Sequence, residues 1–298
     1  FNIFITIKTF LNEINLFYIG GGILFKKYGT LGIFMILFVE VNYFLKIQPF
    51  ANWYFPIAWF GYIFIIDALN YKLKGNSLMS NRIWQFIGML VLSALVWWTF
   101  ELLNLPIKNW GYNGVFGINA LDNVVKKTIC FSTVVPAIFE TAELIRNIHL
   151  FDKIKLKKKH NITKNFLYGM IAAGIISLIL PFIFPTYTFP LIWLSFFFLL
   201  DPINYMHKQP SIIGHLKDKK LKIPLSLMGA GIVCGFLWEF WNYWAVTKWT
   251  YDIPFVNFFK IFEMPILGYF GYFPFALELY VMYFFVRSLF LKKEKLLV

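Results

Sequence analysis

The sequence is poor in charged residues, cysteine and histidine. Asp, Glu, Lys and Arg make up only 14% of the 298 residues, whereas charged residues form about a quarter of a typical soluble domain. This shortage excludes an ordinary water-soluble enzyme. The two cysteines, Cys130 and Cys234, lie inside apolar runs, where they cannot form a disulfide framework. The four histidines lack the spacing of metal ligands, and no glycine-rich phosphate loop is present, so the sequence predicts no metal and no cofactor.

Apolar residues are abundant instead. Hydrophobic types account for 59% of the chain and aromatic residues for 21%. Several apolar runs reach about 18 residues or more, the length that a helix needs to cross a bilayer. The sequence therefore predicts an all-α, polytopic membrane protein, preceded at residues 1–28 by an N-terminal segment that lies in the membrane interface. Eight spans are expected, at residues 29–47, 52–70, 84–105, 127–147, 165–185, 187–206, 224–247 and 265–290.

The net charge of +13 comes from cations that lie mostly between the predicted spans. Of the 28 Lys and Arg residues, 22 lie in the N-terminal segment, in the loops after the second, fourth and sixth spans, in the C-terminus, or at the adjoining ends of the fourth and eighth spans. By the positive-inside rule, both termini are then cytoplasmic. The excess of positive charge is therefore explained by the orientation of the protein in a cell membrane, and a nucleic-acid partner is not expected. The basic linker at 151–164 fits the same rule, with binding to anionic lipid as the alternative.

The two halves of the chain resemble each other. The second and sixth spans end in FIIDALNYKLKGNS and FLLDPINYMHKQPS, whose matching residues are 134 apart. The later motifs match at 138 or 139 residues. We therefore predict two four-helix repeats, at residues 29–150 and 165–298. Because four is an even number of spans, the repeats would insert in the same orientation, as parallel repeats. The matched pairs include Asp67 with Asp201, Glu101 with Glu239, Asn104 with Asn242, Trp110 with Trp249, Tyr112 with Tyr251 and Glu140 with Glu278.

Eight of the 15 acidic residues fall within predicted spans, where an ionisable group is costly and is a functional candidate. Asp67 and Asp201 end their spans before basic loops, so we interpret them as structural acids that anchor helix ends. The remaining candidates for acid–base catalysis are Glu140, Glu278, Glu101, Glu239 and Glu143. Glu140 and Glu143 share one helix face, and two carboxylates that close would keep one of them protonated as a general acid. Hydrogen bonding between helices is the structural alternative for Glu101 and Glu239.

Aromatic residues collect beside these acids near the predicted outer surface. Trp238 and Trp241 form a stripe along the seventh span, next to Glu239. An aromatic cleft of this kind suits a long apolar ligand, and aromatic faces can stabilise a developing cation. The alternative is an interfacial aromatic belt combined with helix packing. The predicted ligand-binding residues are Asn104, Asn242, Trp238, Trp241, Trp110, Trp249, Tyr112 and Tyr251.

These motifs resemble the integral-membrane lycopene cyclase domain, which occurs as two small subunits or as a tandem fusion. The matching stretches are Ile66–Asp67, Leu200–Asp201, Trp241–Asn242, Trp249-Thr-Tyr251 and Glu263-Met-Pro265, and they cover spans two to four and six to eight. The resemblance implies a shared topology and an isoprenoid-handling ancestry. The family's paired Glu-Glu after the proline is absent here, because ILGYFGYF follows Pro265 and AIFETAE follows Pro136. This departure argues against ring closure.

The sequence thus predicts a membrane protein that binds or modifies a long isoprenoid or carotenoid-like lipid. If it is an enzyme, we expect cofactor-independent acid–base isomerisation or cyclisation. Two other functions stay open at this point. One is a non-catalytic subunit that assembles with other membrane subunits, and the other is an ion-coupled transporter built on parallel repeats and buried carboxylates.

Overall fold

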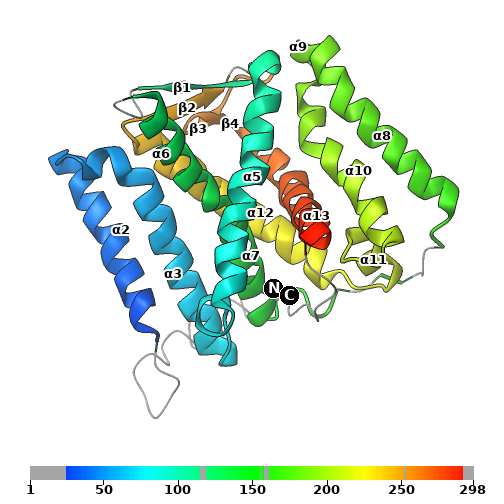
Figure 1. The fold of residues 1–298 in the computed structure, drawn as a ribbon, viewed down its shortest axis with the longest axis horizontal. Helices are drawn as coiled ribbons and strands as arrows, with labels where there is room; N and C mark the ends of the chain where they lie inside the picture. The colour runs from blue at the N-terminus through cyan, green and yellow to red at the C-terminus, as the bar shows by residue number, and fades with distance from the viewer. Residues whose placement is uncertain (1–24, 115–118, 155, 158–160, 252, 291–298) are drawn as a thin grey trace.

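The computed structural model is mostly helical (Figure 1). It describes residues 25–290 except 115–118, 155, 158–160 and 252. Most of the interfacial segment expected at residues 1–28 therefore lies outside the described residues. The longer helices are α2 (Lys27–Leu45), α3 (Tyr54–Lys74), α5 (Ile83–Ile107), α6 (Ala120–Ser132), α7 (Val134–Asn147), α8 (Lys164–Ile183), α10 (Ile192–Met206), α12 (Lys222–Trp244) and α13 (Tyr272–Phe290).

Seven helical segments of the described chain are long and apolar enough to cross a membrane. They are residues 27–45, 83–107, 120–147, 164–183, 185–206, 222–244 and 266–290. Each overlaps one of the predicted spans. The remaining predicted span, 52–70, forms α3, which has 21 residues and packs along α2 but is not among the seven.

Short elements connect and extend these helices. The short α-helices are α4 (Leu78–Asn81), α9 (Pro185–Thr188) and α11 (Ile212–Lys217), and the 3₁₀ turns are η2 (Phe50–Trp53), η3 (Phe189–Leu191) and η4 (Ile266–Gly271). Helices α4 and α11 begin in the same way, since Ser77 and Ser211 each accept a backbone N–H bond as the N-cap.

The predicted span at 127–147 begins earlier and is broken into α6 and α7. Thr133 lies between the two helices, and its hydroxyl donates back to the Cys130 carbonyl at 2.7 Å. Pro136 has no N–H to continue the ladder across this point. The additional turn before residue 127 carries a Lys126–Asp122 ion pair at 2.9 Å. Because these two charges lower the hydropathy, the apolar pattern begins later than the helix.

A pair of packed helices forms each of two opposite edges of the molecule. Helices α2 and α3 pack together at one edge, and α8 and α10 pack together at the opposite edge (Figure 1). Between them, α12 packs against both α7 and α13, while α5 packs against α6, α7 and α13. The contacts of α7 with α12 and of α5 with α13 join the first half of the chain to the second.

Two strands from different halves pair above this central group. Strands β1 (Trp110–Asn113) and β2 (Lys248–Tyr251) form an antiparallel ribbon. In the register, Trp110 lies opposite Tyr251 and Tyr112 lies opposite Trp249. A second small ribbon joins β3 (Lys260–Ile261) to β4 (Met264–Pro265). Apart from Pro265, these strand residues lie between the predicted spans, so the strands are additions to the predicted helical fold.

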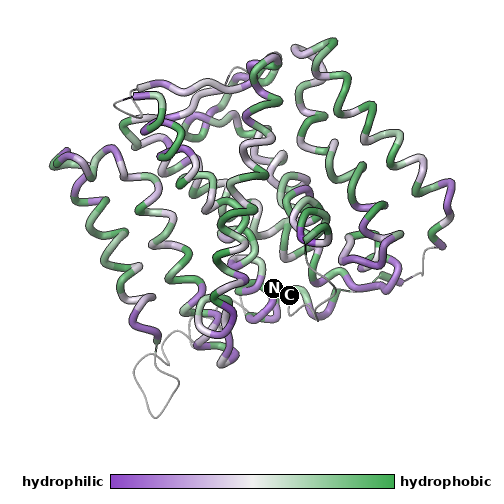
Figure 2. The backbone as a smooth tube through the Cα atoms, viewed as in Figure 1, coloured by the Kyte–Doolittle hydropathy of each residue, from purple (hydrophilic) through white to green (hydrophobic). Residues whose placement is uncertain are grey.

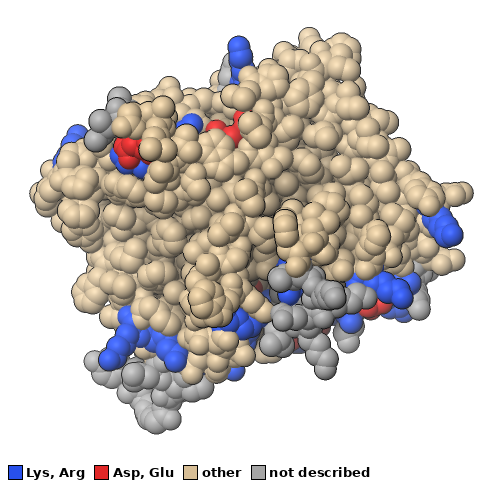
Figure 3. Space-filling model, viewed as in Figure 1, with Lys and Arg blue, Asp and Glu red and all other residues tan. Residues whose placement is uncertain are grey.

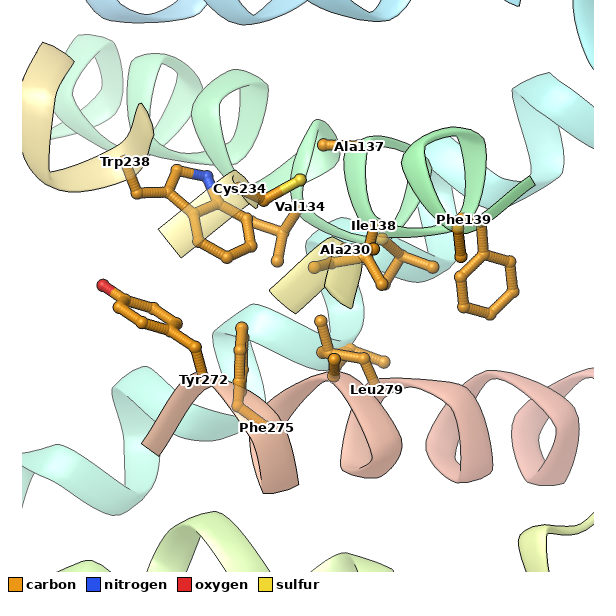
Figure 4. Close-up of a cluster of buried hydrophobic side chains, with 14 of the residues drawn as sticks. Val134, Ala137, Ile138, Phe139, Ala230, Cys234, Trp238, Tyr272, Phe275 and Leu279 are labelled. Carbon is orange, nitrogen blue, oxygen red and sulfur yellow. The ribbon is translucent and has the colours of Figure 1, made fainter. Parts of the chain in front are cut away.

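The core lies where α7, α12 and α13 meet (Figure 4). Ile138 of α7, Ala230 of α12 and Leu279 of α13 are fully buried there. Apolar residues follow the helices through the middle of the molecule (Figure 2). On the face drawn in Figure 3, Lys and Arg are concentrated along the lower edge, opposite the β1–β2 ribbon.

Candidate functional site

The ends of α5 and α12 hold the β1–β2 ribbon through two equivalent asparagines. The Asn104 side-chain amide donates to the Trp110 carbonyl at 2.8 Å, and its oxygen accepts the Trp110 N–H at 3.3 Å. The Asn242 amide donates to the Trp249 carbonyl at 2.9 Å and accepts the Trp249 N–H at 2.8 Å. Each asparagine thus satisfies the backbone of the first tryptophan after its helix. Asn104 and Asn242 were predicted to bind a ligand, but their side-chain amides bond to the protein backbone.

Two predicted acids lie directly below the ribbon. Oε1 of Glu101 accepts hydrogen bonds from the Tyr112 hydroxyl at 2.7 Å and from Trp110 Nε1 at 3.0 Å. Oε1 of Glu239 accepts from the Tyr251 hydroxyl at 2.8 Å. Tyr112 and Tyr251 therefore connect each carboxylate to the ribbon in the same way.

The surroundings of Glu239 differ from those of Glu101. Glu239 is fully buried, and the same Oε1 also accepts the Tyr272 hydroxyl at 2.6 Å. Its Oε2 has no hydrogen-bond partner among the described residues. Oε2 of Glu101 instead lies 4.0 Å from the ammonium of Lys127.

A partly open cavity of about 400 Å³ lies next to these acid–tyrosine pairs. Its size falls within the usual range for small-molecule sites, which are mostly apolar with a few convergent polar groups. Trp238, Tyr272 and Phe275 gather at one end of the cluster in Figure 4 and belong to its wall. The other principal lining residues are Phe55, Trp97, Trp110, Tyr112, Lys127, Cys130, Phe131, Val134, Phe189, Trp193, Trp249, Tyr251, Val256, Met264, Leu267 and Gly271.

The cavity wall offers neutral polar groups at the two ribbon tyrosines. Burial first, and then the nearby Glu101 carboxylate, raises the pKa of Tyr112 well above its usual range. Burial and Glu239 raise the pKa of Tyr251 in the same direction. Both hydroxyls therefore stay protonated at any physiological pH. The wall is therefore uncharged at these two tyrosines.

The other predicted acids lie away from this cavity. Glu140 is buried and accepts an amide bond from Asn70 at 2.8 Å. Glu143 forms an ion pair with Lys74, near the end of α3. Glu278 is fully buried, and its Oε1 accepts the Phe196 N–H at 2.8 Å in the first turns of α10.

The two predicted structural acids each hold the start of a short helix. Asp67 accepts the Met79 N–H of α4 at 2.8 Å. Asp201 accepts the Ile212 and Ile213 N–H groups of α11 at 2.6 and 2.8 Å. Both carboxylates thus order the backbone that follows their span.

Trp241 and Trp238, which the sequence placed on one stripe, share Trp59 as a neighbour but differ in their other contacts. The Trp241 ring packs on Trp59 at 5.0 Å, and its Nε1 donates to Glu40 of α2 at 3.0 Å. Trp238 packs on Trp59 at 5.3 Å and on Tyr272 at 5.9 Å. Only Trp238 of this pair belongs to the cavity wall.

Several residues of the wall are not among the predicted site residues, notably Trp193, Tyr272, Phe275 and Lys127. One signal was present for Trp193, which lies 134 residues after Trp59 in the offset of the matched motifs. In the structure, Trp193 stacks on Phe100 at 5.2 Å and Trp59 packs on Trp238 at 5.3 Å. Tyr272, Phe275 and Lys127 have no such counterpart, so nothing in the pattern marked them.

Comparison of the chain with known protein families, curated proteins and solved structures finds no match. Its site is therefore interpreted from its own geometry. Within the described residues, no group of three or more His, Cys, Asp or Glu side chains could hold a metal ion.

Proposed function

We propose that this protein is an eight-span membrane protein that binds a long apolar lipid of the isoprenoid class in the aromatic cavity beside the β1–β2 ribbon. The single observation that carries the proposal is the cavity wall, which is built mainly from aromatic and aliphatic side chains. Such a wall favours a hydrocarbon chain by burial and by contact with ring faces. The isoprenoid class comes from the resemblance of the sequence motifs to membrane lycopene cyclase domains.

We also infer that the fold consists of two parallel four-helix repeats, with α3 as the eighth span. The ribbon register supports this, because Trp110 opposite Tyr251 and Trp249 opposite Tyr112 are the same pair exchanged. A two-fold axis along the membrane normal would produce this exchange. The equivalent asparagine contacts with Trp110 and Trp249 support it as well.

The orientation of the protein follows from its cations. On the face drawn in Figure 3, Lys and Arg lie predominantly on the side away from the ribbon. We propose that this side is cytoplasmic and that both termini are on it. The ribbon and the cavity would then lie toward the outer surface of the membrane.

Ligand binding is better supported than a reaction. Of the five predicted catalytic acids, Glu101 and Glu239 contact cavity-lining tyrosines, whereas Glu140, Glu143 and Glu278 bond elsewhere. Acid–base chemistry on the ligand would involve the hydroxyl of Tyr112 or Tyr251, held by its carboxylate.

The test is to identify the lipids that co-purify with the protein in mild detergent by mass spectrometry. We expect an isoprenoid to be enriched over the bulk membrane extract. Gly271→Leu should remove it, because Gly271 lines the cavity and a side chain there meets open space. Gly88→Leu is the matched control, since Gly88 is exposed on α5 and also has open space around it.

The proposal fails if the wild-type protein carries only the phospholipids of the bulk extract. It also fails if Gly271→Leu retains the isoprenoid at the wild-type level. Enrichment in the wild type and in Gly88→Leu but not in Gly271→Leu would support it.

A further inference from the structure

The cavity has one cationic position in its described wall. Lys127 of α6 is the only charged residue among the described lining residues. Its side chain is 19% exposed, and its ammonium lies 4.1 Å from the centre of the Tyr112 ring. A charged group held in a largely apolar wall requires a reason, because burying it costs free energy unless a partner compensates.

The contacts of Lys127 within the protein are weak compared with those of its neighbour. Lys126 pairs with Asp122 at 2.9 Å, one helical turn away. Lys127 approaches Glu101 Oε2 only to 4.0 Å, the outer limit of an ion pair. An ammonium has three donors, and this contact together with the Tyr112 ring leaves donor capacity for a molecule in the cavity.

The cationic position is confined to one part of the wall. The position that matches Lys127 at the 138-residue offset is Pro265, so the second half supplies no corresponding cation. Much of the remaining wall is apolar, as at Phe189, Trp193 and Leu267. The arrangement of one cation and a long apolar surface is complementary to an amphiphile with a single anionic head.

We propose that Lys127 forms a head-group subsite for a phosphate or carboxylate, with the apolar chain of the same molecule in the aromatic cavity. The anion would accept a charge-assisted hydrogen bond from the Lys127 ammonium. This inference rests on the proposed function, because it assumes that the cavity holds a lipid. It adds that the lipid is an anionic amphiphile rather than a plain hydrocarbon.

Cys130 provides a reporter for the test, because it lines the cavity one turn after Lys127 on the same helix. In a Cys234→Ala protein it is the only cysteine. The rate at which a maleimide labels Cys130 is measured against increasing concentrations of three C20 prenyl probes: the monophosphate, the carboxylic acid and the alcohol. Quenching of tryptophan fluorescence by the same probes in the unsubstituted protein is a second measurement that needs no cysteine change.

We expect at least one of the two anionic probes to protect Cys130 at a concentration at least about tenfold lower than the alcohol requires. This factor follows from the strength of hydrogen bonds to charged groups. The comparison of phosphate with carboxylate identifies the head group. Lys127→Met should abolish the advantage of the anionic probes over the alcohol without weakening the protection that the alcohol gives. Lys126→Met should behave like the wild type.

Equal protection by all three probes, or an equal loss of all three in Lys127→Met, would overturn the head-group subsite but leave lipid binding intact. If no probe protects Cys130 or quenches the fluorescence, the proposed function fails together with the subsite.

Discussion

Gly231 offers the sharpest test of how the central helices pack. It lies on α12 where that helix meets α13, and a methyl group added there would overlap the backbone carbonyl oxygen of Tyr272. The Cβ of Ala276 would be 3.0 Å away. A backbone oxygen cannot rotate out of the way as a flexible side chain can. Gly231→Ala must therefore separate the two helices.

The expected size of the effect follows from two opposing contributions. Overpacking a well-packed core costs about 1 to 3 kcal/mol, and the fixed backbone contact places Gly231→Ala in the upper part of that range. Alanine recovers about 1 kcal/mol of helix propensity over glycine. We expect a net loss of about 1 to 2 kcal/mol in the free energy of opening, which is about a five- to thirtyfold increase in the open population.

Cys234 reports this opening directly. It is fully buried on α12, one turn after Gly231. When reclosing is faster than labelling, the rate of maleimide modification follows the open population. Peptide mass spectrometry distinguishes Cys234 from the other cysteine, Cys130. We expect Gly231→Ala to accelerate labelling of Cys234 by the factor given above.

The matched control is Gly88→Ala, because a Cβ at Gly88 on α5 meets nothing within 4 Å. That substitution should leave the labelling rate of Cys234 unchanged. Equal rates in the wild-type protein and in Gly231→Ala would refute the close α12–α13 contact. Equal acceleration by both substitutions would refute the local argument.

Three further predictions concern polar contacts. Asn242→Ala removes both hydrogen bonds to the Trp249 backbone and should cost about 1 to 3 kcal/mol of stability. The loss is measured as faster amide hydrogen exchange of the ribbon, and unchanged exchange would contradict the role assigned to Asn242. Burial lowers the pKa of His215 to about 4 from 6.5, so unfolding takes up a proton as the pH falls from 6.5 towards 4. This uptake should remove up to about 3 kcal/mol of stability. His215→Gln, whose side chain does not titrate in this range, should therefore show a smaller drop in unfolding midpoint between pH 7 and pH 4.5. Ser211→Ala removes the N-cap of α11 and should cost about 1 kcal/mol, detected as a lower melting temperature than that of the wild type.

The helical part of the fold could be predicted because an apolar run long enough to cross a bilayer is visible in the local sequence. The predicted span 84–105 corresponds to α5 at 83–107, and 224–247 corresponds to α12 at 222–244. The ribbon could not be predicted in this way. Its strands have four residues each, and each pairs with a segment well over 100 residues away. The alternation of Trp249, Thr250 and Tyr251 is a strand signal, but it does not name the partner strand.

The candidate site was predicted in part for a related reason. Glu101 and Asn104 lie three residues apart and so share one helix face, and the structure joins both to the residues of β1. Spacing also suggested that Glu140 and Glu143 would act together, yet they bond to Asn70 and Lys74 of another helix. Which partner a buried acid finds is decided by tertiary packing, which helical periodicity alone does not contain.

The cavity differs in one important respect from the framework that surrounds it. The ribbon, the asparagine contacts and the acid–tyrosine pairs occur in both halves, so they are properties of the inferred repeat. The cavity wall combines repeated residues, such as Trp110 and Trp249, with residues at which the halves differ. At the 138-residue offset, Tyr272 corresponds to Val134 and Lys127 corresponds to Pro265, and three of these four residues line the cavity. Substitutions at Asn104, Asn242, Glu101 or Glu239, which bond to the chain itself and are not in the cavity wall, should therefore affect stability first. Substitutions at Tyr272 or Lys127 should affect the choice of ligand first.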